Sequence, residues 1–131
     1  MVVLDTHTWI WWVNQSPELS RKAGQGIRKA MTAEAVYISS ISAWEVAMLV
    51  TQKRLALTME VRDWIRACAA LPFVHFVPVN NDIVVTAVHL PEGLHKDPAD
   101  RMIAATANFL DMPLVTRDRR LLEYPGVRAF W

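Results

Sequence analysis

Short apolar runs alternate with helical patterns along the whole chain, and this alternation limits the fold more than any other feature. Runs rich in β-branched and aromatic residues predict strands, and apolar residues recurring every three or four positions predict helices. The expected strands are residues 2–4, 35–39, 73–79, 113–116 and 127–130. A βα alternation of this kind is typical of a parallel sheet with helices on both faces. We therefore predict an α/β fold, a three-layer α/β/α sandwich around a central parallel sheet.

Capping residues indicate where the helices begin. In residues 16–31, Ser16 fits the N-cap and Pro17 the first helical position. Ser42 and Glu45 have capping-box spacing at the start of the next helix. Further helices are expected at residues 59–70, after Asn80 or Asn81, after Asp97 and within residues 117–124.

Length and composition limit the class of protein. The 131 residues suit one domain spanning 1–131, and the net charge of +1 means that any nucleic-acid surface must be local. The single cysteine, Cys68, excludes an internal disulfide and a cysteine-rich zinc site. The chain has no apolar run of about 18 residues for a membrane span, and its opening "MVVLDTHTW" lacks the pattern of a signal peptide. We expect a cytoplasmic protein without a membrane association.

Carboxylates follow the predicted strands. Asp5 comes directly after residues 2–4, Glu45 lies one turn into the helix after the second strand, and Asp118 follows "PLVTR". Asp97 and Asp100 lie at the start of the helix before that last strand. Because ligands bind at the carboxyl ends of parallel strands, these acids are expected to face one edge of the sheet.

Each acid also has a purely structural interpretation. Asp5 and Asp118 could cap the helices that follow them, and Glu45 fits the capping box. A buried strand end is a costly place for an unpaired charge, which favours a functional role for Asp5. For Glu45 and Asp118, only their placement together with the other acids favours a functional site.

Clustered carboxylates repel one another, and a bound divalent cation relieves that repulsion. Oxygen ligands without cysteine or paired histidine favour Mg²⁺ or Mn²⁺ over Zn²⁺, and such sites suit phosphodiester hydrolysis. Other chemistries lack their motifs: there is no glycine-rich phosphate loop, HExxH or nucleophile elbow. The four histidines show no ligand spacing and are interpreted as packing or surface residues.

Four segments in order resemble the PIN-domain family, and within it the VapC-type toxins of type II toxin–antitoxin pairs. They are "VLDTHTWIWW", "SSISAWEVAMLV", "DPADRMIAATA" and "PLVTRDRRLLEY". The resemblance implies a Mg²⁺- or Mn²⁺-dependent endoribonuclease with catalytic residues Asp5, Glu45, Asp100 and Asp118. It also implies a cognate antitoxin, an RNA substrate and a homodimer.

The resemblance further implies roles for these acids. Asp5, Asp100 and Asp118 would bind the metal, while Glu45 would bind a second metal or orient the attacking water. In "HKDPADR", Asp97 precedes proline and suits the N-cap, so it is kept as a substitute or indirect ligand. Asp100 then falls at the third helical position, where the helix dipole is expected to lower its pKa.

Substrate and partner surfaces follow from the charges and tryptophans near these motifs. Arg101, Arg117, Arg119 and Arg120 flank the acids and are candidates for RNA phosphate contacts. Trp9 and Trp12 would share one helix face, with Trp11 pointing elsewhere. Core packing is one interpretation of the three, and a wall of an antitoxin groove together with "AMLV" is the other.

Two rival interpretations keep the same fold. In one, the acids are structural caps, and the chain is a catalytically inactive binding module that acts through a protein partner. In the other, the chain is a metal-dependent nuclease that acts on DNA.

Overall fold

Five parallel strands form one sheet in the computed structural model, which describes residues 1–131. The strand order is β3-β2-β1-β4-β5, and every neighbouring pair is parallel. The strands are β1 Val2–Leu4, β2 Val36–Ser39, β3 Val74–Val77, β4 Leu114–Val115 and β5 Ala129–Phe130. The predicted central parallel sheet is confirmed.

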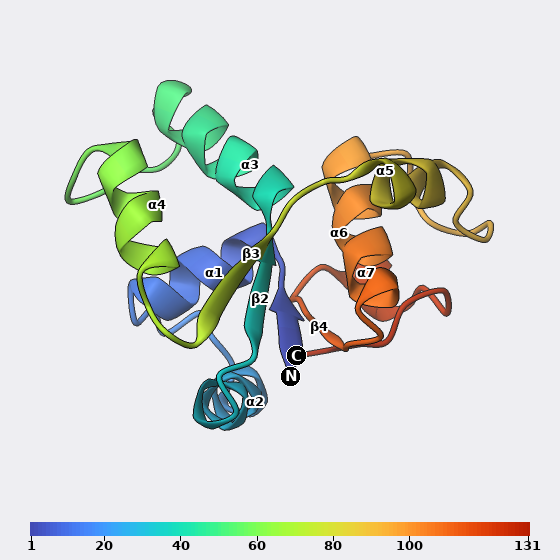
Figure 1. Ribbon diagram of the computed structural model, residues 1–131, viewed down its shortest axis with the longest axis horizontal. Helices are drawn as coiled ribbons and strands as arrows, with labels where there is room; N and C mark the ends of the chain where they lie inside the picture. Colours follow the sequence, from blue (N-terminus) through green and yellow to red (C-terminus); the bar gives the residue numbers. More distant parts are fainter.

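Helices cover both faces of this sheet (Figure 1). They are α1 Thr6–Val13, α2 Arg21–Thr32, α3 Ser40–Thr51, α4 Val61–Ala69, α5 Asn81–Val88, α6 Pro98–Phe109 and α7 Arg119–Leu122. None of them combines the length and the hydrophobicity that crossing a bilayer requires.

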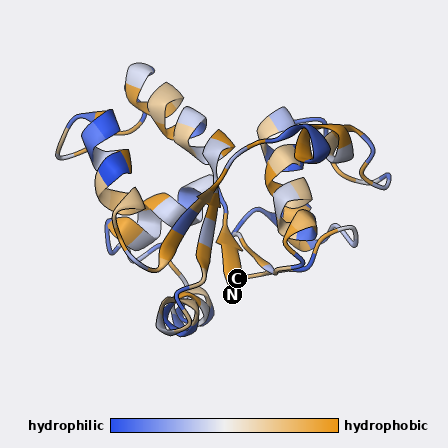
Figure 2. Ribbon diagram, viewed as in Figure 1, coloured by the Kyte–Doolittle hydropathy of each residue, from blue (hydrophilic) through white to orange (hydrophobic).

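The alternation of side chains along β1 produces the layers. Val2 and Leu4 pack in a buried cluster with residues of α1, α2 and α4, whereas Val3 packs in a second cluster with residues of α6 and α7. Figure 2 shows hydrophobic residues concentrated along the strands between these helices. Since successive strand residues face opposite sides, one short apolar strand serves both halves of the core.

The sheet reverses its direction of growth between β1 and β4. From β1 the chain adds β2 and β3 on one side, and then β4 and β5 on the other. Crossover helices therefore lie on opposite faces at this point, and the carboxyl ends of β1 and β4 open into a crevice. This topology brings Asp5 beside the segment that carries Asp118.

Two of the expected helix starts are wrong. Helix α2 begins at Arg21 with Ser20 as its N-cap, because Ser16 instead accepts from the Glu18 backbone N–H in a local turn, at 3.1 Å. The capping box of Ser42 and Glu45 does not form either, since Ser39 caps α3 and Ser42 is buried within the helix. Glu45 is thereby released from any capping role.

The three neighbouring tryptophans divide between the core and the surface. Trp9 is fully buried against Trp64 and Phe76, with ring centroids 4.8 and 5.4 Å away. Trp12 is partly buried and packs against the same cluster. Trp11 points elsewhere, as its helical position predicts, and remains part-exposed.

Candidate functional site

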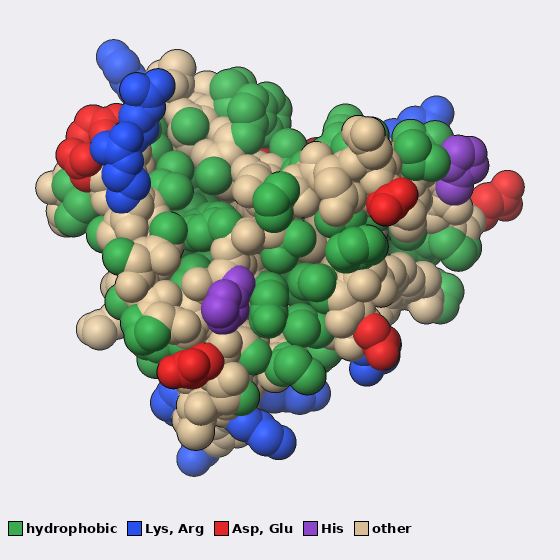
Figure 3. Space-filling view, in the orientation of Figure 1, with side chains coloured by type: hydrophobic (Ala, Val, Ile, Leu, Met, Phe, Trp, Pro, Cys, Tyr) green, Lys and Arg blue, Asp and Glu red, His purple; other side chains and the backbone are tan.

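A cleft of about 780 Å³ lies at the carboxyl edge of the sheet. The surface is notched between the region of α3 and that of α5 and α6 (Figure 3). The predicted site residues that line the cleft are Asp5, Glu45, Asp97, Asp100, Arg117, Asp118 and Arg120. Segments far apart in the sequence therefore meet in one place, as the sequence predicts.

Asp5 is held at the end of β1 by two hydrogen bonds. Its Oδ1 accepts from the Thr8 backbone N–H at 2.8 Å, which makes it the N-cap of α1, and its Oδ2 accepts from the Thr116 hydroxyl. The side chain is buried, and burial raises the pKa of its carboxyl against the opposing effect of these hydrogen bonds. Asp5 therefore caps α1 and also lines the cleft.

Thr116 joins the ends of β1 and β4. While its hydroxyl donates to Asp5, its oxygen accepts from the Asp118 backbone N–H at 3.0 Å. The hydroxyl therefore sets the position of Asp118 relative to Asp5. The sequence offered no signal for this role, because a threonine after a strand is ordinary.

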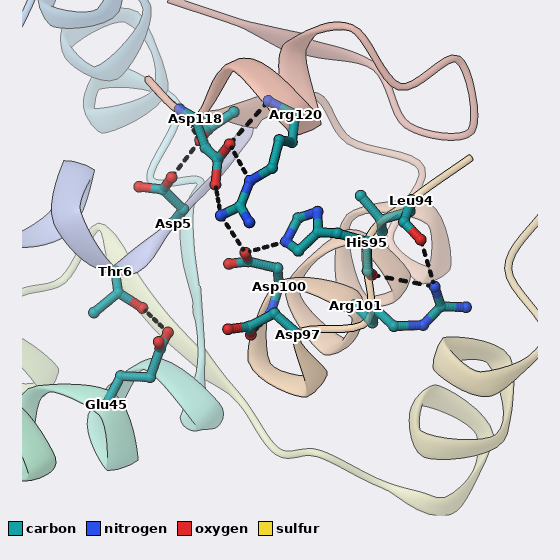
Figure 4. Close-up of polar contacts among 11 residues, drawn as sticks. Asp5, Thr6, Glu45, Leu94, His95, Asp97, Asp100, Arg101, Asp118 and Arg120 are labelled. Atoms are coloured by element: carbon teal, nitrogen blue, oxygen red, sulfur yellow. Dashed lines mark hydrogen bonds and ion pairs between the residues drawn. The ribbon is translucent and has the colours of Figure 1, made fainter. Parts of the chain in front are cut away.

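Asp118 caps α7 and pairs with an arginine. Its carboxylate accepts from Arg120 through Nε at 3.2 Å and Nη2 at 2.9 Å (Figure 4). The hydrogen bonds from Arg120 hold the pKa of Asp118 below its ordinary value. Asp118 is therefore ionised at neutral pH.

Asp100 lies between a histidine and the same arginine. Its Oδ2 is 2.6 Å from His95 Nε2 and 3.6 Å from Arg120 Nη2. Burial raises the pKa of Asp100, assisted by the charges of Asp97 and Asp118, although the His95 hydrogen bond opposes it. The expected lowering by the helix terminus is wrong, because desolvation of the carboxyl outweighs that dipole.

Glu45 reaches the cleft from the opposite wall. Its Oε1 accepts from the Thr6 hydroxyl at 2.5 Å, and Thr6 Oγ1 lies 2.9 Å from Ser42 Oγ. Burial raises the pKa of Glu45, and repulsion from Asp100 and Asp97 adds to the effect. Figure 4 shows Glu45 on α3 across from the other carboxylates, which come from other elements.

Asp97 begins α6 as the sequence predicts. It is the N-cap, with Pro98 next, and its Oδ1 accepts from the Asp100 backbone N–H at 3.0 Å. It also lines the cleft. Its cap hydrogen bond fixes the first turn that carries Asp100.

The four candidate arginines separate into two pairs. Arg117 and Arg120 line the cleft. Arg119 points away and pairs with Glu123, Nε to Oε1 at 3.1 Å. Arg101 donates to four backbone carbonyls, so its donors are engaged in holding α5 and the following loop together. The structure therefore leaves two arginines, Arg117 and Arg120, beside the acids.

His95 is a site residue that the sequence interpretation missed. Ligand atoms of His95, Asp100 and Asp118 all lie within 4.8 Å of one another. Its only sequence signal was its place in "HKDPADR", five residues before Asp100, which matches no familiar ligand spacing. The loop that follows α5 brings it beside Asp100 and Asp118, and a search for histidine pairs could not detect that.

The PIN domain model matches residues 2–127. The chain belongs to the PIN domain family. It is 38% identical over 123 residues to Ribonuclease VapC22 of Mycobacterium tuberculosis, covering 94% of this chain and 91% of that protein. The resemblance of this PIN domain to VapC-type toxins is therefore confirmed.

Solved structures share the fold at low identity. VapBC2 from Rickettsia felis, bound to a promoter DNA fragment, aligns with a TM-score of 0.73 at 16% identity, over 99% of this chain and 98% of that one. A toxin–antitoxin complex from Klebsiella pneumoniae aligns with a TM-score of 0.64 at 22% identity, over 100% and 97%. Both alignments confirm the PIN-like α/β architecture.

The donors in the cleft fit a hard divalent cation. Asp5, Asp100 and Asp118 offer carboxylate oxygens, and Cys68 is buried in the core, away from them. Carboxylate oxygens are preferred by Mg²⁺ and Mn²⁺. His95 Nε2 lies 2.6 Å from Asp100 Oδ2, so its imidazole is placed to orient that carboxylate. Burial is the main cause of the raised pKa of Glu45 and Asp100, and a cation would offset the smaller effect of repulsion between the acids.

We predict that Asp5→Asn stabilises the fold at neutral pH when the metal is chelated. Burial raises the folded-state pKa of Asp5 above the ordinary 3.8. Its contribution to stability is therefore complete below pH 3.8 and is lost as the pH rises through the raised value. Asparagine removes the charge but keeps the cap. In thermal unfolding with EDTA, Asp5→Asn should unfold at a higher temperature at neutral pH, with the difference vanishing in acid.

Asp5→Ala is the matched control for this experiment. It removes the charge and also the cap, at a cost of about 0.5–2 kcal/mol, so it should be less stable than Asp5→Asn at every pH. An Asp5→Asn protein that is less stable than the original chain at neutral pH would contradict the assignment of a desolvated charge.

Proposed function

We propose that the chain is a metal-dependent endoribonuclease, the toxin of a type II toxin–antitoxin pair. The observation that carries the proposal is the convergence of Asp5, Glu45, Asp100 and Asp118 on one cleft of a PIN domain. The name of the mycobacterial relative, a ribonuclease, supports RNA as the substrate.

Asp5, Asp100 and Asp118 would hold Mg²⁺ or Mn²⁺, with Asp97 as an indirect ligand. When bound, such a cation supplies positive charge for the scissile phosphate and lowers the pKa of water. The hydrogen bonds of Thr8 and Thr116 fix both oxygens of Asp5, so this ligand is placed in advance. Pre-placed groups avoid the cost of ordering during the reaction.

Glu45 is suited to handle the proton of the attacking water. Its raised pKa brings the carboxyl closer to the working pH, where a general base is most effective. The Thr6 hydroxyl fixes one of its oxygens, which leaves the other free to face the cleft. Attack on the phosphorus would leave a 5′-phosphate and a 3′-hydroxyl.

Arg120 and Arg117 would contact the RNA backbone. The guanidinium of Arg120 stands between Asp118 and Asp100, at 2.9 and 3.6 Å, where the phosphate must approach. Since a guanidinium binds phosphate oxygens in a fixed geometry, Arg120 would orient the scissile group.

A cognate antitoxin and a second copy of the chain are the proposed protein partners. The Klebsiella pneumoniae structure is titled a toxin–antitoxin complex, which supports the first. Trp11, Trp44 and Met48, from α1 and α3, line one side of the cleft, where the antitoxin groove was expected. An antitoxin there would exclude RNA by occupying the same space.

Cleavage of a structured-RNA panel tests the proposed activity. We expect cleavage with Mg²⁺ or Mn²⁺, and none with EDTA, because the carboxylates need a cation to act on an anionic substrate. Asp100→Asn should abolish cleavage, whereas the matched variant Asp97→Asn should retain it, since asparagine also caps a helix. Product bands on a denaturing gel give the readout.

Three outcomes would contradict the proposal. Cleavage that survives EDTA would exclude the metal site. An active Asp100→Asn beside an inactive Asp97→Asn would exchange the two roles. A DNA panel of the same sequences, cleaved while RNA is not, would favour the DNA nuclease.

Expression in bacteria tests the toxin assignment. We expect growth arrest from the chain alone, none from Asp5→Asn, and relief by co-expression of a small gene encoded next to it. Arrest that persists in Asp5→Asn would show that toxicity does not depend on the carboxylates. Colony counts and growth curves provide the measurement.

A further inference from the structure

An aromatic and cationic cluster forms the α1 wall of the cleft. Trp11, His7 and Arg117 all line the cleft, next to Asp5 and Asp118. The Trp11 ring centroid is 5.6 Å from that of His7, and the Arg117 guanidinium carbon is 5.6 Å from the Trp11 ring centroid. Trp131 meets Trp11 in an edge arrangement at 5.7 Å.

Trp11 is not needed to complete the core. Trp9 belongs to the buried cluster on that face of the sheet and Trp12 packs against it, whereas Trp11 lines the cleft. Neither aromatic neighbour is parallel to it, since the interplanar angles are 47° with His7 and 62° with Trp131. His7 and Trp131 therefore contact the indole in tilted and edge arrangements, and neither ring stacks flat on it.

The cluster lies beside the acids in the same cleft. Asp5 caps the helix that carries Trp11, and both residues line the cleft. Arg117 precedes Asp118, and an ion pair with Glu18 restrains its guanidinium. A nucleotide with its phosphate at the carboxylates would therefore extend its base toward Trp11.

We propose that Trp11, with His7 and Arg117, forms a subsite for an unpaired nucleobase next to the scissile phosphate. The proposal rests on the proposed ribonuclease function and adds the part of the RNA that this wall binds. Aromatic rings and guanidinium planes bind splayed-out bases by stacking, whatever the base, because every base has a π-face. A base inside a duplex is already stacked and cannot insert.

The polar lining of the cleft supports a nucleotide over an apolar peptide as the occupant. Five carboxylates line it with Arg54, Arg117, Arg120 and Trp11, so the arginines together with the proposed cation would meet the backbone while the ring meets the base. Arg117 pairs with Glu18 and lies over one face of the indole, which leaves the opposite face of the ring for a base. An antitoxin that also contacts this wall would compete with the base.

The test measures RNA binding, so that it does not depend on cleavage. In a Glu45→Gln background with Mg²⁺, which keeps the three proposed metal ligands, a labelled single-stranded oligoribonucleotide is titrated by fluorescence anisotropy. Trp11→Leu keeps apolar volume but has no flat π-face, and it should weaken binding about tenfold. Trp11→Phe keeps a ring and should remain within about threefold of the unsubstituted protein. Phe109→Ala removes an aromatic ring that is 54% exposed elsewhere, and it should change nothing.

Two further ligands separate stacking from general contact. An abasic strand of the same length should bind Trp11→Leu and the unsubstituted protein equally, and a duplex of the same sequence should show no dependence on Trp11. The subsite would be overturned if Trp11→Leu and Trp11→Phe weakened RNA binding equally. It would also be overturned if Trp11→Leu weakened binding of the abasic strand as much as binding of the intact strand. If the original chain binds RNA as described but cleaves none, the proposed function fails and the subsite stands.

Discussion

The site depends on one buried carboxylate at the end of β1. Both oxygens of Asp5 are held, one by the first turn of α1 and one by Thr116 after β4. The same hydrogen bonds therefore begin a helix, join two neighbouring strands and fix a charged group where the sheet changes direction. Because desolvation opposes ionisation there, the charged form of Asp5 costs stability that a nearby cation would restore. The start of α1, the link between β1 and β4 and the proposed metal site therefore all depend on the position of Asp5.

Charge is unevenly compensated across the cleft. Arg120 keeps Asp118 ionised, whereas burial and mutual repulsion raise the pKa of Asp100 and Glu45. The charged forms of Asp100 and Glu45 therefore cost stability, which is a common cost of functional sites. The PIN domain assignment and the likeness to Ribonuclease VapC22 make catalysis the simplest reason to retain them.

Local sequence signals predicted the sheet, the edge at which the acids meet and Asp97 as the N-cap of α6, because strand patterns and proline act over a few residues. Contacts between distant segments could not be predicted in this way. The hydrogen bond of Thr6 to Glu45 and the approach of His95 to Asp100 depend on how helices cross above the sheet. The pKa of Asp100 was misjudged for the same reason, since burial is a tertiary property. Arg101 looked like an RNA ligand in sequence, yet folding places its donors on backbone carbonyls.

The central claim is that Asp5, Asp100 and Asp118 hold one divalent cation at the edge of the sheet. Anomalous diffraction from crystals soaked in Mn²⁺ tests it most directly. The account predicts an anomalous peak within coordination distance of carboxylate oxygens from all three residues, and no peak there in Asp5→Asn crystals. A Mn²⁺ peak that lies elsewhere on the chain, or a cleft without one at saturating Mn²⁺, would contradict it.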